Sequence, residues 1–452
     1  MTSTRTRRDV VELDRARVWH PYTSIDEWER TEPIVVTRAE GAAFWDADGA
    51  RYLDGNSSWW VAALGHGHPR LLRVLREQAG ALAHVSLAGI THEPAAVLAE
   101  ELVAVAPRGL SRVFYTDNGS GSVEVAIKIA VQAWRQRGAP KKTRFLALDG
   151  AFHGDTLGAT SLGGVDVFRR PFADIVFDCV HAPFPSPDAY ERAFATIAEM
   201  IERDADSLAA VVVEPIVQGA AGMRIYEPRF LSELRDLTRR RDVLLIVDEV
   251  FAGYGRTGRM WACDHAGITP DVMCLGKAFS ALLPMGAALV TEDVFDAFRG
   301  GKDRTLYYGH TFCGHPLGAA LAREVLAIYR DEAVVAEAAA KAPRIRAAFE
   351  RIAALPGVER VRSVGMIGAA DLAPTGAGGY FGDAGWRVYE EAKKRGAYLR
   401  PLGDTVYVCP PLVIGDADLD ALLGDARHAP QFPAPLPPVF LLVDDVDALL
   451  TP

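Results

Sequence analysis

Four polar groups in the middle of the chain each follow a short apolar run. Asp248 follows LLIV, Lys277 follows VMCLG, Glu214 follows AVVV, and the run NGSGS at 118–122 comes shortly after RVFYT. In an open parallel sheet, ligands bind beyond the carboxyl ends of the strands, so these groups are expected to face one crevice. That crevice would hold a lysine amine, carboxylates and a helix start able to bind an anion.

This set of groups matches the needs of pyridoxal 5′-phosphate. The cofactor takes a lysine amine on its aldehyde carbon, a carboxylate against its pyridinium nitrogen and a helix N-terminus with small residues for its phosphate. Each group also has a structural alternative, with Asp248 as a helix cap, Lys277 as a surface lysine and the Gly/Ser run as a plain loop. Their joint occurrence, each after a strand, favours the cofactor site.

The stretch VLLIVDEVFAGYGRTG (243–258) also contains a G-x-G-x-x-G pattern, formed by Gly253, Gly255 and Gly258. A dinucleotide site needs its first glycine at the strand tip, where helix N–H groups meet the pyrophosphate. Here five residues separate LLIV from Gly253, and two of them are the carboxylates Asp248 and Glu249. Because carboxylates would repel a pyrophosphate, an NAD-dependent or nucleotide-binding protein is the remote alternative.

Short, continuous apolar runs alternate with helix-like stretches through the middle of the chain. Such runs are typical of strands buried on both faces, and their alternation with helices predicts an α/β fold with a mainly parallel, doubly wound sheet. The predicted strands cover 112–116, 144–149, 209–215, 243–249 and 272–277. One predicted helix begins at Ser122, as its N-cap, and stops at Gly138.

The two ends of the chain differ from its middle. Residues 1–75 contain short strand signals, including a hairpin turn at Asp48-Gly49, and helices after about residue 325 lead into a few strands. We predict a large cofactor-binding domain over 76–325 and a smaller α/β domain built from both 1–75 and 326–427. A Pro-rich linker and tail cover 428–452.

Composition excludes several classes of function. A net charge of −10 argues against a nucleic-acid partner. No apolar run approaches membrane-spanning length, and the N-terminus lacks the apolar core of a secretory signal. The five cysteines are scattered, and the pair His66 and His68 has no third ligand in evident range, so neither a disulfide framework nor a metal site is predicted. We expect a cytoplasmic protein that acts on small molecules.

Several motifs together resemble a known family. VVVEPIVQGAAGM, LLIVDEVFAGYGRTG and CLGKAFS are similar to the core motifs of class III (subgroup II) pyridoxal-phosphate aminotransferases of fold type I. WHPYTS, DGNSSWWVAALGHGHP, DNGSGSVEVAIKIA and FHGDT narrow the likeness, which covers about residues 15 to 425. These motifs resemble members that aminate 8-amino-7-oxononanoate in biotin biosynthesis, which implies that acceptor and S-adenosylmethionine, or lysine, as the donor.

The resemblance implies a role for each matching residue. Lys277 would hold the cofactor covalently and then serve as general acid and base, and Asp248 would bond the pyridine nitrogen. Thr311 would reach the cofactor phosphate of a neighbouring subunit, which implies an obligate homodimer, and Arg400 would clamp a substrate carboxylate. The other residues implied to contact the cofactor are Gly121, Ser122, Phe152 and His310. Those implied to contact the substrates are Tyr22, Trp59, Trp60, Phe152, Lys277 and Gly309. Arg256 is a weaker candidate for a substrate contact, and its alternative is a structural ion pair.

The chain departs from the family pattern at several positions. Phe152 stands where the family usually has tyrosine, Gly309-His310-Thr311 replaces a Gly-Pro-Thr pattern, His315 stands where asparagine is common, and Phe251-Ala252 replaces a small Ala-Thr pair. These positions line the donor side of the pocket, so of all the implied features the identity of the amino donor is the one that the resemblance specifies least. A broad ω-amino-acid or diamine aminotransferase is therefore the second interpretation.

Overall fold

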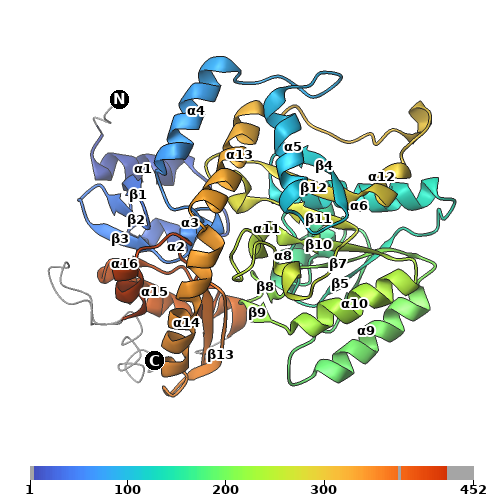
Figure 1. Ribbon diagram of the computed structural model, residues 1–452. Helices are drawn as coiled ribbons and strands as arrows, with labels where there is room; N and C mark the ends of the chain where they lie inside the picture. Colours follow the sequence, from blue (N-terminus) through green and yellow to red (C-terminus); the bar gives the residue numbers. More distant parts are fainter. Residues whose placement is uncertain (1–4, 375–377, 425–452) are drawn as a thin grey trace.

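The computed structural model describes residues 5–374 and 378–424, and a seven-stranded sheet lies at its centre (Figure 1). All neighbouring strands run parallel except β12, which is antiparallel to both of its neighbours. The predicted α/β fold with a mainly parallel sheet is confirmed. In order across the sheet, the strands are β4 (Leu110–Thr116), β12 (Gly286–Thr291), β11 (Val272–Leu275), β10 (Leu244–Asp248), β7 (Leu208–Val213), β5 (Arg144–Leu148) and β6 (Cys179–Ala182).

Helices cover both faces of this sheet. Every residue of β7 and β10 is buried, and a strand without a polar face must be covered on both sides. One face packs against α6 (Gly119–Gln136) and α7 (Leu157–Leu162). The other face packs against a longer set, which comprises α5 (Glu93–Val105), α9 (Tyr190–Asp204), α10 (Pro228–Arg240) and α13 (Pro316–Asp331).

The predicted strands match the observed ones closely, and the differences in their ends matter for the site. β7 stops at Val213 and β11 at Leu275, so Glu214 and Lys277 lie in loops just beyond the sheet edge. The sequence missed β6 and β12. It also placed the start of α6 too late, because the Asn118 side chain, rather than Ser122, caps this helix by accepting a hydrogen bond from the Gly121 N–H at 2.7 Å.

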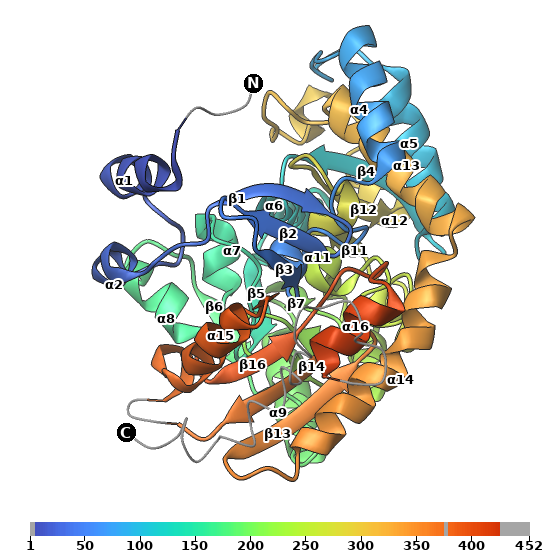
Figure 2. The same cartoon turned by 90° about the vertical axis from the view of Figure 1, so that its left-hand side faces the viewer.

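The two ends of the chain meet in one small sheet of order β1-β2-β3-β15 (Figure 2). β2 (Ala43–Asp46) and β3 (Arg51–Asp54) form the predicted hairpin, with Gly49 at a φ of +85° in its turn. β15 (Ala397–Tyr398) runs parallel to β3 and so joins the C-terminal part to the N-terminal part. The domain limits 1–75, 76–325 and 326–427 stay predictions, and the linker and tail at 428–452 lie outside the described residues.

The remaining elements surround these two sheets. Within the described part of the chain, no helix combines the length and the apolar character needed to cross a membrane, and the five cysteines are all free. The other strands are β1 (Val36–Glu40), β8 (Val217–Gln218), β9 (Arg224–Ile225), β13 (Val358–Val364), β14 (Ile367–Leu372) and β16 (Thr405–Val408); the other helices are α1 (Arg7–Arg17), α2 (Ile25–Arg30), α3 (Ser57–Trp60), α4 (Pro69–Ala81), α8 (Asp166–Arg169), α11 (Glu249–Ala252), α12 (Glu292–Asp296), α14 (Val334–Ile352), α15 (Ala384–Lys394) and α16 (Asp416–Leu423).

Candidate active site

Asp248 is the last residue of β10, and both of its carboxylate oxygens are held by the protein. One oxygen accepts the Val250 N–H at 3.0 Å and thereby caps the short helix α11. The other lies 2.8 Å from Nδ1 of His153, whose ring is buried. The helix-cap alternative raised by the sequence is therefore correct for one oxygen, while the second faces the FHGDT loop. Two separate hydrogen bonds fix the orientation of this buried carboxylate.

Lys277 begins a single 3-10 turn directly after β11. Its φ of +50° lies in the left-handed region, which a non-glycine residue keeps only where its surroundings hold it. The amine lies 5.0 Å from the ring centre of Trp60 and 5.9 Å from that of Phe251. Burial lowers the pKa of Lys277, and the charge of Asp248 opposes that shift. The amine therefore loses its proton more easily here than on a surface lysine, and a nucleophile or a base must be in that neutral form.

Gly276 allows the Lys277 loop to lie directly on the start of α6. A β-carbon at Gly276 would sit 2.9 Å from the Cα and 3.1 Å from the backbone nitrogen of Gly119, which is too close for either backbone to stay in place. We expect Gly276→Ala to lower the free energy of unfolding by about 1–3 kcal/mol. Cofactor affinity should also fall, because Lys277 would move away from the helix start. Urea unfolding and a cofactor titration measure the two effects.

The matched control for this substitution is Gly80→Ala. Gly80 lies exposed in α4, and a β-carbon there would meet no atom within 4 Å. Alanine is the better helix former, so this variant should be neutral or more stable by up to about 1 kcal/mol. Wild-type stability in Gly276→Ala would show that the loop and α6 are not packed backbone to backbone.

The first turn of α6 points to a revised anion contact. A helix leaves its first N–H groups without intrahelical acceptors, and these groups bind phosphate. In this helix Asn118 takes the Gly121 N–H, while the Ser122 hydroxyl donates to the Gly119 carbonyl at 2.6 Å. Among the described residues, no protein acceptor is found for the N–H groups of Gly119 and Ser120. The geometry therefore moves the expected phosphate contact from Gly121 and Ser122 to Gly119 and Ser120.

Glu214 holds the backbone of the ring-stacking candidate Phe152. One carboxylate oxygen accepts the Phe152 N–H at 3.0 Å and the other accepts the Gly219 N–H at 2.9 Å. Burial raises the pKa of Glu214 to about 7, and the charge of Asp248 acts in the same direction. The sequence placed Glu214 at the sheet edge without a role. In the structure it fixes the loop that carries Phe152 and His153.

An aromatic wall surrounds Arg400 on the outer side of the site. The guanidinium carbon of Arg400 lies 5.2 Å from the ring centre of Trp59 and 5.5 Å from that of Trp386. Arg400 also donates to the Tyr22 carbonyl oxygen at 3.2 Å. The Tyr22 ring meets Trp59 edge-on, at 5.5 Å between centres. The predicted residues Tyr22, Trp59 and Arg400 are thus brought together.

Sequence reasoning missed three aromatic residues of this wall. Phe168 lies between the rings of Tyr22, at 5.3 Å, and Phe152, at 5.6 Å. Tyr380 meets Phe168 edge-on at 4.9 Å, and it lies close enough to Arg400 for that charge to act on the pKa of its hydroxyl. The third is Trp386. No motif marks these residues, because Phe168 is distant in sequence from Tyr380 and Trp386 and only the tertiary fold brings them into one wall.

The glycine pattern at 253–258 does not form a dinucleotide site. Gly253 ends the short helix α11 rather than opening a helix. The Gly258 N–H donates to the Gly255 carbonyl at 3.0 Å, and both glycines have positive φ values, of +93° and +83°, so they form a tight turn. A pyrophosphate would find no helix N-terminus after these glycines, which excludes the geometry that the pattern requires.

The comparisons with known proteins agree with this chemistry. Residues 24–429 match the family model for class-III aminotransferases. The chain belongs to the class-III aminotransferases. A relative from Geobacter sulfurreducens, named adenosylmethionine-8-amino-7-oxononanoate aminotransferase, is 40% identical over 438 residues, which cover 93% of this chain and 96% of the relative.

Solved structures of class-III aminotransferases share the fold. The adenosylmethionine-8-amino-7-oxononanoate aminotransferase of Methanocaldococcus jannaschii has a TM-score of 0.88 at 32% identity, covering 92% of this chain and 96% of that one. An omega transaminase of Pseudomonas jessenii, solved in complex with PMP, has a TM-score of 0.86 at 29% identity, covering 92% and 96%. This chain is therefore an aminotransferase of the α/β fold that these enzymes share.

Class-III aminotransferases depend on pyridoxal phosphate, and the residues present fit that group. The N–H groups of Gly119 and Ser120 are available for the phosphate. Asp248 presents a fixed carboxylate at the end of β10. The amine of Lys277 is close enough to Asp248 and Glu214 for both charges to act on its pKa.

Arg256 and the segment 309–311 are the remaining predicted parts of the site. Arg256 is buried and donates to the Pro410 carbonyl at 2.6 Å and to the Ser57 hydroxyl at 3.4 Å, so its observed contacts are structural hydrogen bonds rather than the ion pair given as its alternative. Thr311 and Gly309 are exposed. His310 lies between them, with its Nε2 3.6 Å from the Asp117 carboxylate at the start of α6. The segment 309–311 therefore borders the site but presents Thr311 outward.

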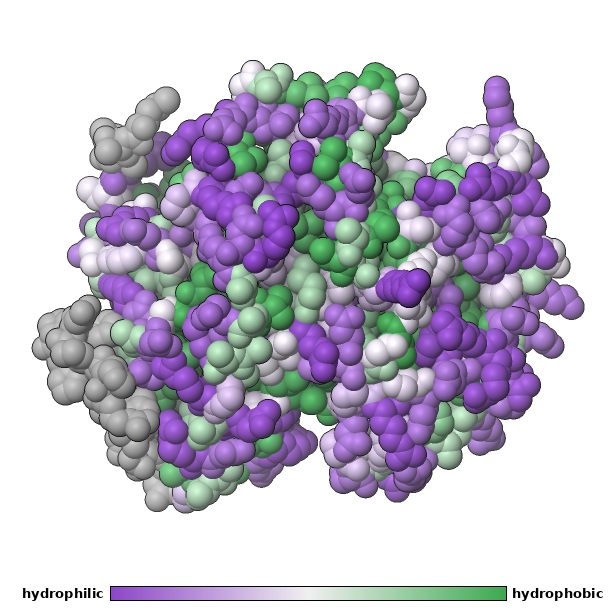
Figure 3. Space-filling view, viewed as in Figure 1, coloured by the Kyte–Doolittle hydropathy of each residue, from purple (hydrophilic) through white to green (hydrophobic). Residues whose placement is uncertain are grey.

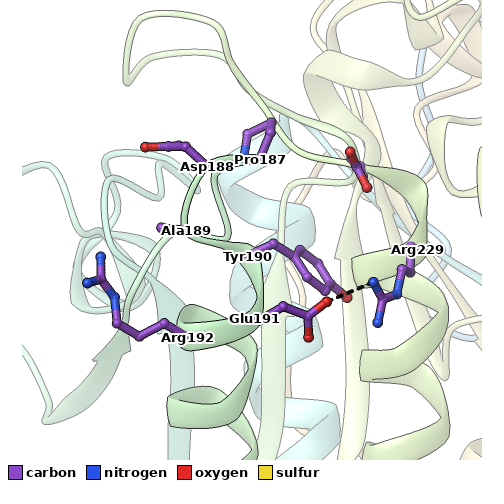
Figure 4. A pocket seen from close by; sticks show the side chains of 8 residues that line it. Pro187, Asp188, Ala189, Tyr190, Glu191, Arg192 and Arg229 are labelled. Atoms are coloured by element: carbon purple, nitrogen blue, oxygen red, sulfur yellow. Dashed lines mark hydrogen bonds and ion pairs between the residues drawn. The ribbon is translucent and has the colours of Figure 1, made fainter.

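A separate surface hollow of about 460 Å³ lies at the first turns of α9 and α10 (Figure 4). None of the predicted site residues lines it. Some of its polar groups are paired: Arg229 bonds both Glu191, at 3.0 Å, and Glu233, at 2.6 Å, and the Tyr190 hydroxyl donates to Glu233 at 2.6 Å. The hollow is therefore separate from the candidate site at Lys277.

Proposed function

We propose that this class-III aminotransferase transfers an amino group to 8-amino-7-oxononanoate and so makes 7,8-diaminononanoate in biotin biosynthesis. S-adenosylmethionine, or lysine, is the proposed donor. The names of the curated relatives support this assignment. Within the chain itself, the proposal rests on the position of Arg400, whose guanidinium lies between the rings of Trp59 and Trp386 on the outer side of the site.

The acceptor is a long chain with a carboxylate at one end and a reacting ketone near the other. Aromatic walls such as Tyr22 and Trp59 can bury its methylenes, each of which contributes up to about 0.8 kcal/mol. Methylenes do not fix the position of the chain, so a charged anchor must decide which carbon reaches Lys277. Arg400 suits that task because its planar fork holds a carboxylate in one orientation.

The chain's own residues have separable tasks in the reaction. When bound, pyridoxal phosphate supplies an electron sink that makes the substrate Cα–H bond acidic. Lys277 Nζ, with its lowered pKa, takes that proton and returns it to the neighbouring carbon. Asp248 keeps a proton on the pyridine nitrogen through its charge. Trp60 and Phe251 flank the amine and exclude water from it.

Substitution of Arg400 tests the substrate assignment. Arg400→Ala should raise KM for 8-amino-7-oxononanoate by about 10- to 100-fold, the cost of losing hydrogen bonds to a charged group. A short amine without a carboxylate should react as before. Arg400→Lys keeps the charge but loses the fork, so it should fall between the two. Steady-state kinetics on one preparation of each variant provide the measurement. An equal loss on both substrates would mean that Arg400 supports the fold or the cofactor instead.

A second candidate function is a broad ω-amino-acid or diamine aminotransferase. An omega-transaminase from Thermomicrobium roseum has a TM-score of 0.89 at 29% identity, so the fold does not separate the two activities. Phe152 also lacks the tyrosine hydroxyl usual in the family. Comparing 8-amino-7-oxononanoate with simple ketones as acceptors decides between them, because only the first requires a carboxylate anchor.

We further propose that the enzyme is a cytoplasmic homodimer with shared sites. Thr311 is exposed, so it can contact the cofactor of a second molecule that packs against this face. Large apolar side chains of the same segment, Tyr307 and Phe312, are exposed too, as is Ile90. Figure 3 shows hydrophobic residues at the top edge of the molecule, above α4 and α5. An exposed apolar surface of this kind marks a subunit interface.

A further inference from the structure

The helix labelled α3 in Figure 1 is a single left-handed turn formed by four residues without glycine. The φ angles from Ser57 to Trp60 are +49°, +46°, +64° and +74°. A left-handed turn brings each Cβ close to the next carbonyl oxygen, so it is unfavourable at every one of these positions. Backbone strain of this kind persists only where surrounding contacts determine it, and it concentrates at functional sites.

This turn directs two neighbouring tryptophans to different parts of the site. Trp59 is 41% exposed and lies against Arg400 and Tyr22 in the outer wall. Trp60 is buried against Phe251, at 4.4 Å between ring centres, and lies beside the Lys277 amine. The conformation of one short turn therefore sets both the outer wall around Arg400 and the inner wall around the amine.

Ser58 and Trp59, the part of the turn that faces the outer wall, are held by the carboxylate of Asp54. This residue is only 1% exposed, and it ends β3. One oxygen accepts the Ser58 N–H at 2.9 Å, and the other accepts the Ser58 hydroxyl at 2.8 Å and lies 3.0 Å from His66 Nε2. Ser58 is the residue directly before Trp59, so Asp54 fixes the backbone from which that side chain projects.

Ser57 and Trp60, the part of the turn that faces the Lys277 amine, are held by other groups. The Ser57 hydroxyl donates to the Cys409 carbonyl at 2.6 Å, and the Trp60 indole N–H donates to the Tyr407 hydroxyl at 3.2 Å. Loss of the Asp54 carboxylate would therefore loosen Trp59 while Trp60 and the surroundings of Lys277 stay in place. The two halves of the site can be perturbed separately.

Asp54 is also aligned with Arg400 by the small sheet. β3 and β15 run parallel, with Asp54 paired to Tyr398, and the Gly55 N–H donates to the Tyr398 carbonyl at 3.0 Å. Arg400 follows Tyr398 by two residues. The turn that carries Trp59 and the arginine that stacks on it therefore leave adjacent strands at the same edge.

We propose that Asp54 is a positioning residue for acceptor specificity, which holds the left-handed turn so that Trp59 keeps Arg400 oriented toward the carboxylate of the acceptor. This inference rests on the proposed function, because it assumes that Arg400 binds that carboxylate. Asp54 is buried, and its carboxylate is bonded to Ser58 and His66, so it acts on the site through the turn. Its effect is confined to the outer wall and should appear in KM for carboxylated substrates.

The test compares Asp54→Ala, Asp54→Asn and Asp271→Ala. Asp54→Ala should raise KM for 8-amino-7-oxononanoate about tenfold, as small displacements of positioning groups do, and should leave kcat and the reaction of a short amine within about twofold. Asp54→Asn should recover most of the loss, because its amide oxygen still accepts the Ser58 N–H. Asp271 is the matched control, since it pairs with Arg235 at 2.6 and 2.9 Å just before β11, in the seven-stranded sheet rather than the small one.

Asp271→Ala should lower the melting temperature without changing either KM. Amide exchange at residues 57–60 should speed up in Asp54→Ala and not in Asp271→Ala. Equal losses on both substrates, or unchanged exchange at the turn, would overturn the proposal. If Asp54→Ala does not fold, Ser58→Ala replaces it, because this variant removes only the hydroxyl bond to Asp54. The proposal then requires that KM rise for the carboxylated substrate alone.

Failure of the proposed function would look different. In that case the wild-type enzyme would not turn over 8-amino-7-oxononanoate at all. The same variants are then compared on an ω-amino acid and on the amine that lacks its carboxylate. The difference between the two again measures whether Arg400 binds a carboxylate. The exchange measurement needs no substrate and reports directly whether Asp54 holds the turn.

Discussion

Lys277→Ala should lose transamination by a factor of about 10³ or more while the cofactor still binds without a covalent bond. The amine is expected both to hold the cofactor and to carry the proton between two substrate carbons, and alanine can do neither. The phosphate contacts at the start of α6 and the carboxylate of Asp248 remain in this variant, so noncovalent binding should persist. Turnover assays and an absorption titration with cofactor measure the two quantities.

Lys128→Ala is the matched control for this prediction. Lys128 is exposed on α6, and its amine lies 4.7 Å from the ring centre of Tyr308, outside the site. Its loss should leave turnover unchanged, because exposed charges of this kind contribute little. If Lys277→Ala keeps turnover near the wild-type level, another group carries the proton and the assignment fails.

The sheet and the inner site could be predicted because their signals are local. Continuous apolar runs identify strands buried on both faces, and a polar residue directly after such a run must lie at the sheet edge. Asp248, Glu214 and Lys277 are all of this kind. β12 escaped because its run GAALVT is rich in glycine and alanine, which are depleted in strands.

The start of α6 shows how competing local signals mislead. The run NGSGS offers two serines and an asparagine, each of which can cap a helix. Asn118 takes that role in the structure, which moves the helix start, and with it the free N–H groups, toward the N-terminus. The expected phosphate contacts at Gly121 and Ser122 move in the same direction, to Gly119 and Ser120.

The outer site could not be predicted from the residues alone. Phe168 lies far along the chain from Tyr380 and Trp386, and each of the three would serve equally well as an ordinary core or surface aromatic. The left-handed turn at 57–60 is also hidden, because serine and tryptophan rarely adopt positive φ and no glycine marks the position. The conformation is held by side-chain bonds of Asp54, Ser57 and Trp60, which the letters of the DGNSSWW motif do not reveal.

Asp248→Asn should slow the chemical step by about 10²-fold or more, because it removes a charge while keeping the shape of the side chain. The amide oxygen can still accept the Val250 N–H, so the cap of α11 and the local fold should survive. What is lost is the negative charge that keeps a proton on the pyridine nitrogen, and without that proton the ring withdraws electrons less strongly. The loss should therefore fall equally on kcat and kcat/KM, as expected for an interaction that strengthens in the transition state. Single-turnover rates for the donor half-reaction measure it, with Asp271→Asn as a control at the far edge of the sheet. An unchanged rate would mean that a different carboxylate partners the ring nitrogen, and Glu214 would then be the group to substitute.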